Sequence, residues 1–289
     1  MIKLHEDAQF FREAVNLTAA ETGFAPRLIE KDYFCTVLLE HLASMTKAEL
    51  VFKGGTCLAK VHVGFYRLSE DTDFAIPMAV DAPRAERSSR AAGLKAALAA
   101  LPRAQPCFRI VEPLQGANES TQYIGSVSYL SVLDRQEGAI SIEISLREPL
   151  LTSAVTGAAQ TILLDPVSRT PSVPAVSVPC ISKPEAIAEK FRAALTRREA
   201  AIRDFYDLDY VARKDEARTQ DPELITLVKH KLAVPGNDPV TMGPDRLAEL
   251  RRQLDTRLRS VLREQDFSEF DLDRAFAMVG RMADAVACE

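Results

Sequence analysis

Asp71 and Asp73 are separated by a single residue and lead into an apolar run that is typical of a strand. Because alternate residues of a strand point to the same face, a strand that begins here projects both carboxylates together. Two like charges so close raise each other's pKa unless a cation lies between them. The pair therefore indicates either a solvated acidic loop or a site for a hard divalent cation, Mg²⁺ or Mn²⁺.

A pair of glycines precedes these aspartates within the stretch FKGGTCLAKVHVGFYRLSEDTDFAI. Gly54 and Gly55 follow a short apolar run, and Thr56 opens a segment with helical character. Such a pair often forms only a turn, but it also allows the backbone to approach a phosphate closely. The hydroxyl of Thr56 and the N–H groups at a helix start suit an anion. A phosphate cradle and a carboxylate pair in one segment favour a nucleotide site.

A third carboxylate comes from a later strand, AISIEISL. Its isoleucines alternate with polar residues, and Glu143 is the lone acid on the polar face. Phosphoryl or nucleotidyl transfer with two metals generally uses a further carboxylate on a neighbouring strand. Glu143 is a third metal ligand if its strand lies beside residues 71–73, and an exposed strand residue if it does not.

Basic residues surround the same segment. Arg67 precedes the acidic strand, where its guanidinium suits either a triphosphate or the two carboxylates. Lys53 and Lys60 flank the glycine turn and are similar candidates for nucleotide binding.

These residues require a sheet to position them, and the hydrophobic pattern predicts one. Helices are expected over 7–22 and 25–45, strands over 48–53, 71–78, 107–113, 122–133 and 138–150, and an Ala-rich helix over 82–101. Residues 157–184 predict a crossover with one or two edge strands, and every later element is predicted to be helical. The expected fold class is α+β, with a mixed-sheet domain over 1–180 and a helical bundle over 181–289.

The composition narrows the function. Net charge is −5, which argues against a protein that coats nucleic acid non-specifically. No apolar run reaches the ~20 residues that span a bilayer, and the N-terminus lacks the apolar core of a signal peptide. Five cysteines and four histidines are scattered without metal-binding spacing. We therefore expect a cytoplasmic protein without a membrane segment, a disulfide framework or a zinc site.

The motifs together resemble a known family, the nucleotidyltransferase toxins of the AbiEii/AbiGii type, which include the MenT group and belong to the DNA polymerase β-like nucleotidyltransferases. The resemblance runs from about Leu28 to Tyr210 and rests on four motifs in order. These are the turn of Gly54, Gly55 and Thr56; Ser69, Asp71 and Asp73, with Thr72 where an aliphatic residue is usual; the helical Lys190; and Arg203, Asp204, Asp207 and Leu208.

The later motifs also have an interpretation from spacing alone. Lys190 lies one position before Phe191 in an apolar helical stripe, so its ammonium can extend towards a cleft or into solvent. Asp204 and Asp207 share one helix face, where they pair with nearby arginines or act in the site. The resemblance implies that Lys190 faces the nucleotide and offsets charge in the transition state. It favours Asp207 over Asp204 as the functional acid.

The resemblance implies an enzyme whose residues 53–56 hold the β- and γ-phosphates of an NTP, which donates its NMP and releases pyrophosphate. It further implies a toxin opposed by a separately encoded antitoxin, with RNA as acceptor and the 3′ end of tRNA as the leading candidate. Arginines of the C-terminal helices between Arg246 and Arg263 are candidates for phosphate-backbone contacts. The alternatives are a protein or small-molecule acceptor, a kinase, and a non-catalytic binding module.

Overall fold

The computed structural model describes residues 2–45, 50–214 and 221–288. The chain divides into two compact units. The first unit comprises Met1–Leu150 and Ala154–Ile181, and the second comprises Leu151–Ser153 and Ser182–Glu289. Residues 151–153 also belong to the helical unit, which the sequence did not predict. Hydrogen bonds to the Glu185 carboxylate hold them there.

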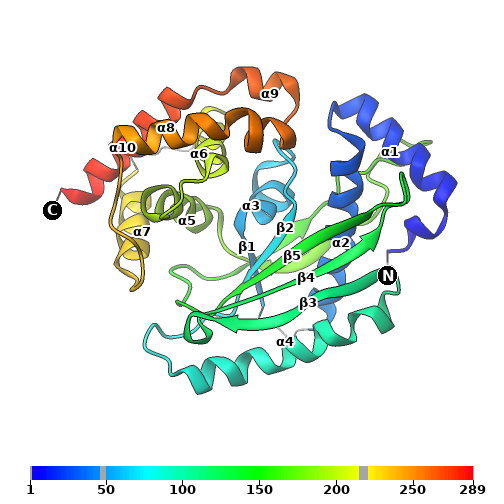
Figure 1. The fold of residues 1–289 in the computed structure, drawn as a ribbon, viewed down its shortest axis with the longest axis horizontal. Helices are drawn as coiled ribbons and strands as arrows, with labels where there is room; N and C mark the ends of the chain where they lie inside the picture. Colours follow the sequence, from blue (N-terminus) through cyan, green and yellow to red (C-terminus); the bar gives the residue numbers. More distant parts are fainter. Residues whose placement is uncertain (1, 46–49, 215–220, 289) are drawn as a thin grey trace. The chain divides into compact units, whose positions relative to one another are not determined.

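The first unit is built on a mixed seven-stranded sheet (Figure 1). Its elements are α1 (Ala8–Thr22), α2 (Pro26–Met45), β1 (Val51–Lys53), α3 (Gly54–Cys57), a π-helical turn (Leu58–Val63), β2 (Asp71–Ala75), α4 (Arg84–Ala104), β3 (Phe108–Ala117), β4 (Gln122–Leu130), β5 (Glu137–Ser145), β6 (Val155–Ala159) and β7 (Val176–Cys180). Single 3₁₀ turns lie at Leu4–Glu6 and Asn118–Ser120.

The strand order is β3-β4-β5-β2-β1-β7-β6, so the two short strands β1 and β2 lie in the interior of the sheet. β2 runs parallel to β5 and antiparallel to β1, and β1 runs parallel to β7. Two segments far apart in sequence, residues 71–75 and 137–145, therefore become neighbours. The predicted strand over 48–53 is represented by β1, and residues 48–49 lie outside the described residues.

One face of the sheet is covered by helices. α2 contacts β2, β5 and β7, while α4 contacts β3. The side chains beneath them are apolar, and they include Phe74 on β2, Ile142 on β5 and Phe34 of α2 stacked on Tyr129 at 4.0 Å between ring centroids. Burial of these side chains fixes the register, because a shift by one residue would move the apolar side chains of a strand from the core face to the opposite face. The acidic residues of β2 and β5 are consequently held on the opposite face.

The helix ends follow local sequence signals. The Asp7 side chain accepts a hydrogen bond from the Phe10 backbone N–H at the start of α1. Gly23 ends that helix with φ 78°, a left-handed conformation that glycine adopts without steric cost. Ser182 caps the first helix of the second unit by accepting from the Glu185 N–H.

The second unit is helical. Its elements are α5 (Lys183–Thr196), α6 (Ile202–Lys214), α7 (Pro222–Ala233), α8 (Pro244–Gln253), a π-helical turn (Leu254–Leu258), a 3₁₀ turn (Arg259–Val261), α9 (Glu264–Glu269) and α10 (Leu272–Ala287). α5 packs on α6, α7 and α10. The fully buried Glu185 pairs with Lys231 at 2.7 Å and accepts from the N–H groups of Leu151 and Thr152, which attaches residues 151–153 to this unit.

The predicted α+β fold class, a mixed sheet followed by a helical region, is confirmed. Two details differ. The stretch GPDRLAELRRQLDTRLRSVL, residues 243–262, has the pattern of one continuous helix, but α8 ends at Gln253 and the chain continues as π and 3₁₀ turns. α9 was not predicted, because its six residues are too few to show a helical period. Within the described residues, no helix has both the length and the apolar character needed to cross a membrane.

Candidate functional site

Three carboxylates lie on adjacent strands of the sheet. Asp71 and Asp73 occupy the first and third positions of β2, whose buried residues Thr72 and Phe74 face the helices. In the parallel ladder between β2 and β5, Asp73 is the partner of Glu143. Paired strand residues project to the same face, so the geometry places Glu143 beside Asp73 rather than at a distant strand position.

The glycine turn approaches these carboxylates directly. In the antiparallel ladder between β1 and β2, Lys53 is the partner of Asp73, and Gly54 follows with φ 74°. A Cβ atom added to Gly54 would lie 2.0 Å from Oδ2 of Asp73. Gly54 is therefore required both by its left-handed backbone and by the space that the Asp73 carboxylate occupies.

Arg67 lies over the second glycine. A Cβ atom added to Gly55 would lie 2.2 Å from Nη2 of Arg67, and the Arg67 side chain is buried. The guanidinium thus packs against the backbone of the turn, where it adds positive charge to a segment that carries two aspartates.

Thr56 and Ser69 frame the same segment. The Thr56 hydroxyl donates a hydrogen bond to the backbone carbonyl of Asp71, which joins α3 to the start of β2. Because this hydroxyl is buried and engaged, the N–H groups of the turn are better placed than the hydroxyl to meet a phosphate. Ser69 is half-buried, two residues before β2.

Lys60 has a different role from the one that its position in the sequence suggested. Its ammonium is buried and lies 2.6 Å from the Asp32 carboxylate, and it also donates to the Thr36 hydroxyl at 2.8 Å. The second Asp32 oxygen accepts from Thr161 and from the Ile162 N–H. Lys60 therefore joins α2 to the chain after β6, and its ammonium is engaged there rather than at the glycine turn.

The site residues fit a divalent cation with a preference for oxygen ligands. Asp71, Asp73 and Glu143 supply carboxylate oxygens from neighbouring positions, and Mg²⁺ or Mn²⁺ selects such ligands. The absence of a Cβ at Gly54 leaves room for Asp73 Oδ2 beside the turn. Lys53, in register with Asp73, can offset part of the negative charge.

The second unit holds its own charged cluster. The Lys190 ammonium on α5 lies 2.8 Å from Oδ1 of Asp204 and 2.8 Å from Oδ2 of Asp207, both on α6. Arg197 reaches the other Asp204 oxygen at 3.0 Å. Burial alone would raise the pKa of Asp204, but Lys190 and Arg197 hold it below its usual range. Both aspartates are buried and fix the lysine, so the structure does not distinguish Asp207 from Asp204.

The comparison with known families decides the identity. A family model described as nucleotidyl transferase AbiEii toxin, type IV toxin–antitoxin system, matches residues 37–279. The chain belongs to this family. It is accordingly a nucleotidyltransferase of the toxin–antitoxin type, as the motifs predicted.

Solved structures share the fold of this AbiEii-family chain. JHP933 from Helicobacter pylori aligns with a TM-score of 0.52 and 16% identity, over 91% of this chain and 93% of that chain. MenT4, a nucleotidyltransferase toxin from Mycobacterium tuberculosis, aligns with a TM-score of 0.50 and 19% identity, over 94% of this chain and 98% of that chain. No curated protein sequence matches this chain significantly.

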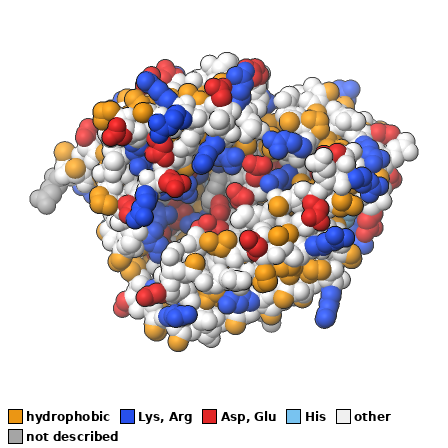
Figure 2. All heavy atoms as spheres, in the orientation of Figure 1, with side chains coloured by type: hydrophobic (Ala, Val, Ile, Leu, Met, Phe, Trp, Pro, Cys, Tyr) orange, Lys and Arg blue, Asp and Glu red, His pale blue; other side chains and the backbone are white. Residues whose placement is uncertain are grey.

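The C-terminal arginines of this AbiEii-family chain do not line one helix face. Arg246 is buried and donates to the carbonyls of Ala194 and Arg197. Arg251 pairs with Asp273, while Arg259 and Arg263 pair with acids of their own segment. Arg252 and Arg257 are exposed and, among the described residues, have no recorded ion pair. Figure 2 shows basic and acidic side chains intermixed over the visible face.

Sequence reasoning missed one further cluster. Cys57, His62 and Cys180 lie together in the first unit, although the spacing of cysteines and histidines predicted no zinc site. The signal was hidden because Cys57 and His62 are five residues apart, which in an α-helix separates two side chains by about 140° around the axis. The π-helical turn of Leu58–Val63 changes that angle.

Proposed function

We propose that this chain is a metal-dependent toxin that transfers NMP from an NTP to the 3′ end of an RNA, with tRNA as the first candidate. The observation that carries the proposal is the convergence of three features on one face of the sheet. Asp73 is in register with Glu143, Lys53 is in register with Asp73, and the Gly54 backbone approaches the Asp73 carboxylate.

The first unit's residues have distinct tasks. Residues 53–56 hold the β- and γ-phosphates through backbone N–H groups, aided by the Lys53 ammonium. Arg67 packs against Gly55 and holds the turn in place, and Ser69 lies two residues before β2. Asp71 and Asp73, with Glu143, would hold the divalent cation, which when bound neutralises charge on the phosphates and lowers the pKa of the attacking hydroxyl.

The reaction is a substitution at the α-phosphorus. The acceptor hydroxyl forms the new P–O bond, its proton leaves, and the bond to pyrophosphate breaks. Positioning and charge stabilisation supply most of the rate, since the protein forms no covalent bond in this scheme.

Lys190, Asp204 and Asp207 are assigned to the same reaction on the strength of their family motifs. Two carboxylates at 2.8 Å fix the Lys190 ammonium, so the side chain loses little freedom when it meets a phosphate. Asp204 and Asp207 are therefore positioning residues for Lys190.

The acceptor is proposed from the family and from surface charge. Proteins of the AbiEii family are toxins of type IV toxin–antitoxin systems, which implies that this chain has an antitoxin partner. Blocking the 3′ end of tRNA would stop aminoacylation, and we expect expression of the active protein to arrest growth. Exposed Arg252 and Arg257 are available for phosphate contacts.

One labelling experiment separates the acceptors. The purified protein is incubated with α-labelled and, separately, γ-labelled NTPs, together with Mg²⁺ and either total tRNA or RNA-free cell extract. Transfer of α-label to tRNA supports the proposal. Transfer of γ-label would indicate a kinase, and α-label on protein or small molecules would replace RNA as the acceptor. No transfer from any NTP would favour a binding-only toxin.

A further inference from the structure

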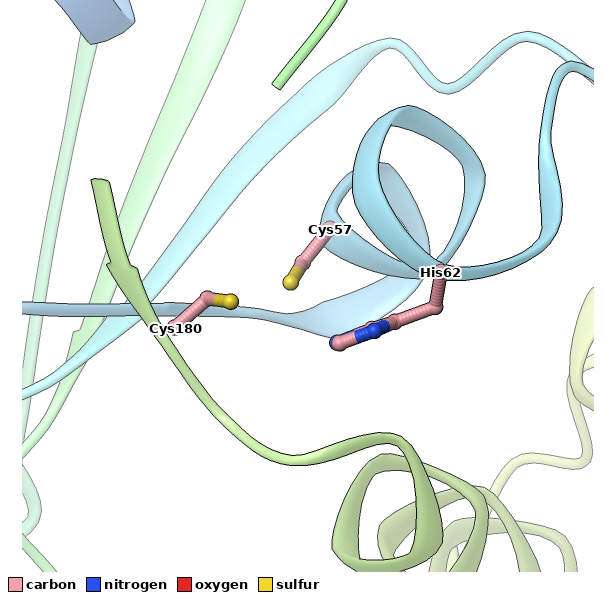
Figure 3. Close-up of side chains that lie close together, drawn as sticks. All are labelled: Cys57, His62 and Cys180. Atoms are coloured by element: carbon pink, nitrogen blue, oxygen red, sulfur yellow. The ribbon is translucent and has the colours of Figure 1, made fainter. Parts of the chain in front are cut away.

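The first unit contains a cluster of two sulfurs and an imidazole that the nucleotidyl-transfer chemistry does not use. Cys57 is the last residue of α3, His62 lies in the π-helical turn that follows, and Cys180 ends β7 (Figure 3). The Sγ atoms of both cysteines and a ring nitrogen of His62 all lie within 4.8 Å of one another. Three potential ligands from two separate segments therefore converge on one point.

We propose that Cys57, His62 and Cys180 bind a thiophilic metal ion, Zn²⁺, at a site separate from the carboxylates. Sulfur and imidazole are ligands that Zn²⁺ prefers, whereas Mg²⁺ prefers oxygen. Two thiolates and one imidazole form a three-ligand set, and a water completes the tetrahedron. Each thiol that still carries a proton releases it to solvent when its sulfur binds the ion.

The surroundings prepare the ligands. His62 Nε2 donates to the backbone carbonyl of Ile181 at 2.8 Å, which fixes the ring and leaves Nδ1 as the nitrogen for the ion. Hydrogen bonds of this kind orient most metal-binding histidines.

Packing around the cluster limits access to one side. Both cysteines are fully buried, and a Cβ added to Gly157 would lie 2.7 Å from Sγ of Cys180, so the chain closes over that sulfur. His62 is half-buried and marks the side from which an ion can enter. The three side chains are therefore surrounded by the fold but remain accessible to an ion from the side of His62.

The site would brace the nucleotide turn. Cys57 directly follows Thr56, whose hydroxyl holds the Asp71 carbonyl, and Cys180 is the β7 partner of Phe52 on β1. An ion joining Cys57 to Cys180 would connect α3 to β7 on the far side of β1 from β2. Because the ion binds the folded chain, it should also raise the melting temperature.

Cobalt provides a test that does not depend on transferase activity. Reduced, metal-free protein is titrated with Co²⁺ in the presence of excess Mg²⁺, and then with Zn²⁺. We expect a thiolate-to-cobalt charge-transfer band that saturates at one equivalent and disappears as Zn²⁺ displaces the cobalt. The carboxylate site cannot produce this band, because it has no sulfur ligand.

Variants assign the band to the cluster. Cys57→Ala removes a buried sulfur, and His62→Ala removes a half-buried ligand with less risk to folding. Each should weaken Zn²⁺ binding by more than about 100-fold, because changing only an outer-shell partner already costs about 10- to 100-fold. Cys107→Ala and Cys288→Ala, outside the cluster, should bind normally. Absence of the band, or an unchanged band in folded His62→Ala protein, would overturn the proposal.

Discussion

Asp73 on β2 and Glu143 on β5 are partners in a parallel ladder, although they are seventy positions apart in the chain. Asp71, two residues earlier on the same face, is the partner of Ser141. The pairing places an Asp-x-Asp element and a distant glutamate side by side on one face of the sheet. It is the feature from which the catalytic proposal follows, and it makes Glu143 testable independently of the aspartates.

Glu143→Gln should lower nucleotidyl transfer by about 100-fold or more without changing stability. The amide has the shape of the carboxylate but lacks its charge, so it binds a divalent cation more weakly. Glu137→Gln, an exposed change on the same strand, is the matched control and should transfer normally. Rates for both variants at several Mg²⁺ concentrations measure the effect. A Glu143→Gln protein with the wild-type rate and the wild-type Mg²⁺ dependence would remove Glu143 from the ligand set.

Gly54→Ala should abolish transfer, because its Cβ would lie 2.0 Å from Oδ2 of Asp73. The residue also has φ 74°, which for alanine costs roughly 1–2 kcal/mol. Gly64→Ala separates these two causes, since Gly64 has φ 86° and an added Cβ there would meet nothing within 4 Å.

Both glycine variants should unfold at lower denaturant concentration than the wild type, and only Gly54→Ala should lose activity. Denaturant unfolding and single-turnover transfer on the same preparations give the comparison. Equal losses of activity in the two variants would show that backbone strain, and not the approach to Asp73, explains the requirement.

Lys190→Ala should destabilise the helical unit by about 3 kcal/mol, because it leaves the buried Asp204 and Asp207 without their shared ammonium. From the sequence alone, Lys190→Ala would be expected to reduce turnover more than stability, whereas the buried ion pairs predict a clear loss of stability as well. Lys190→Arg keeps the charge and should recover most of the stability. If Lys190 also acts on the nucleotide, the arginine variant will still transfer slowly, since a guanidinium places its charge differently.

The same cluster predicts a pH dependence. Asp204 has a folded-state pKa below its usual range, so its contribution to stability is complete above the pKa of an unfolded aspartate, about 3.9. This contribution is lost as the pH falls from there through the lowered folded-state pKa. Urea unfolding between pH 6 and 2.5 should show the loss in wild-type protein and a smaller loss in Asp204→Asn. Parallel pH profiles for the two proteins would contradict the assignment.

Arg252→Glu combined with Arg257→Glu should weaken tRNA binding and leave NTP affinity unchanged. Each lost phosphate contact should reduce the slope of log affinity against log salt by about 1. Arg84→Glu combined with Arg103→Glu makes the same charge change on α4 of the first unit, which packs against β3. Equal weakening by the two pairs would mean that net charge, and not a defined contact, governs RNA binding.

Much of the strand arrangement in the first unit could be predicted from the sequence, because buried and exposed residues alternate along its strands. The alternation in residues 139–146 placed Glu143 on the polar face, and the Asp-x-Asp spacing placed Asp71 with Asp73. The register that joins β2 to β5 was not accessible, since it depends on how the intervening strands pair. The sequence placed Lys60 among the candidates for nucleotide binding at the glycine turn. Its ammonium instead pairs with Asp32 on the earlier helix α2, a contact that chain position does not reveal.

Departures from regular helices explain the other differences. The spacing of the arginines between Arg246 and Arg263 would line one side of a continuous helix, but a π-helical turn at Leu254–Leu258 changes the direction of the side chains after α8. A second π-helical turn hides the approach of His62 to Cys57. Hydrophobic periodicity does not report such turns, since they alter the angle between residues without altering which residues are apolar.

The most direct test of the central claim is transfer of α-labelled NMP to tRNA by Asp73→Asn protein. We expect a loss of about 1000-fold or more, since a bound metal contributes several kcal/mol and each ~1.4 kcal/mol changes the rate tenfold. The exposed Asp81→Asn is the charge-matched control and should retain full activity. Thermal unfolding confirms that both variants are folded. A folded Asp73→Asn enzyme that transfers NMP within tenfold of the wild-type rate would contradict the account.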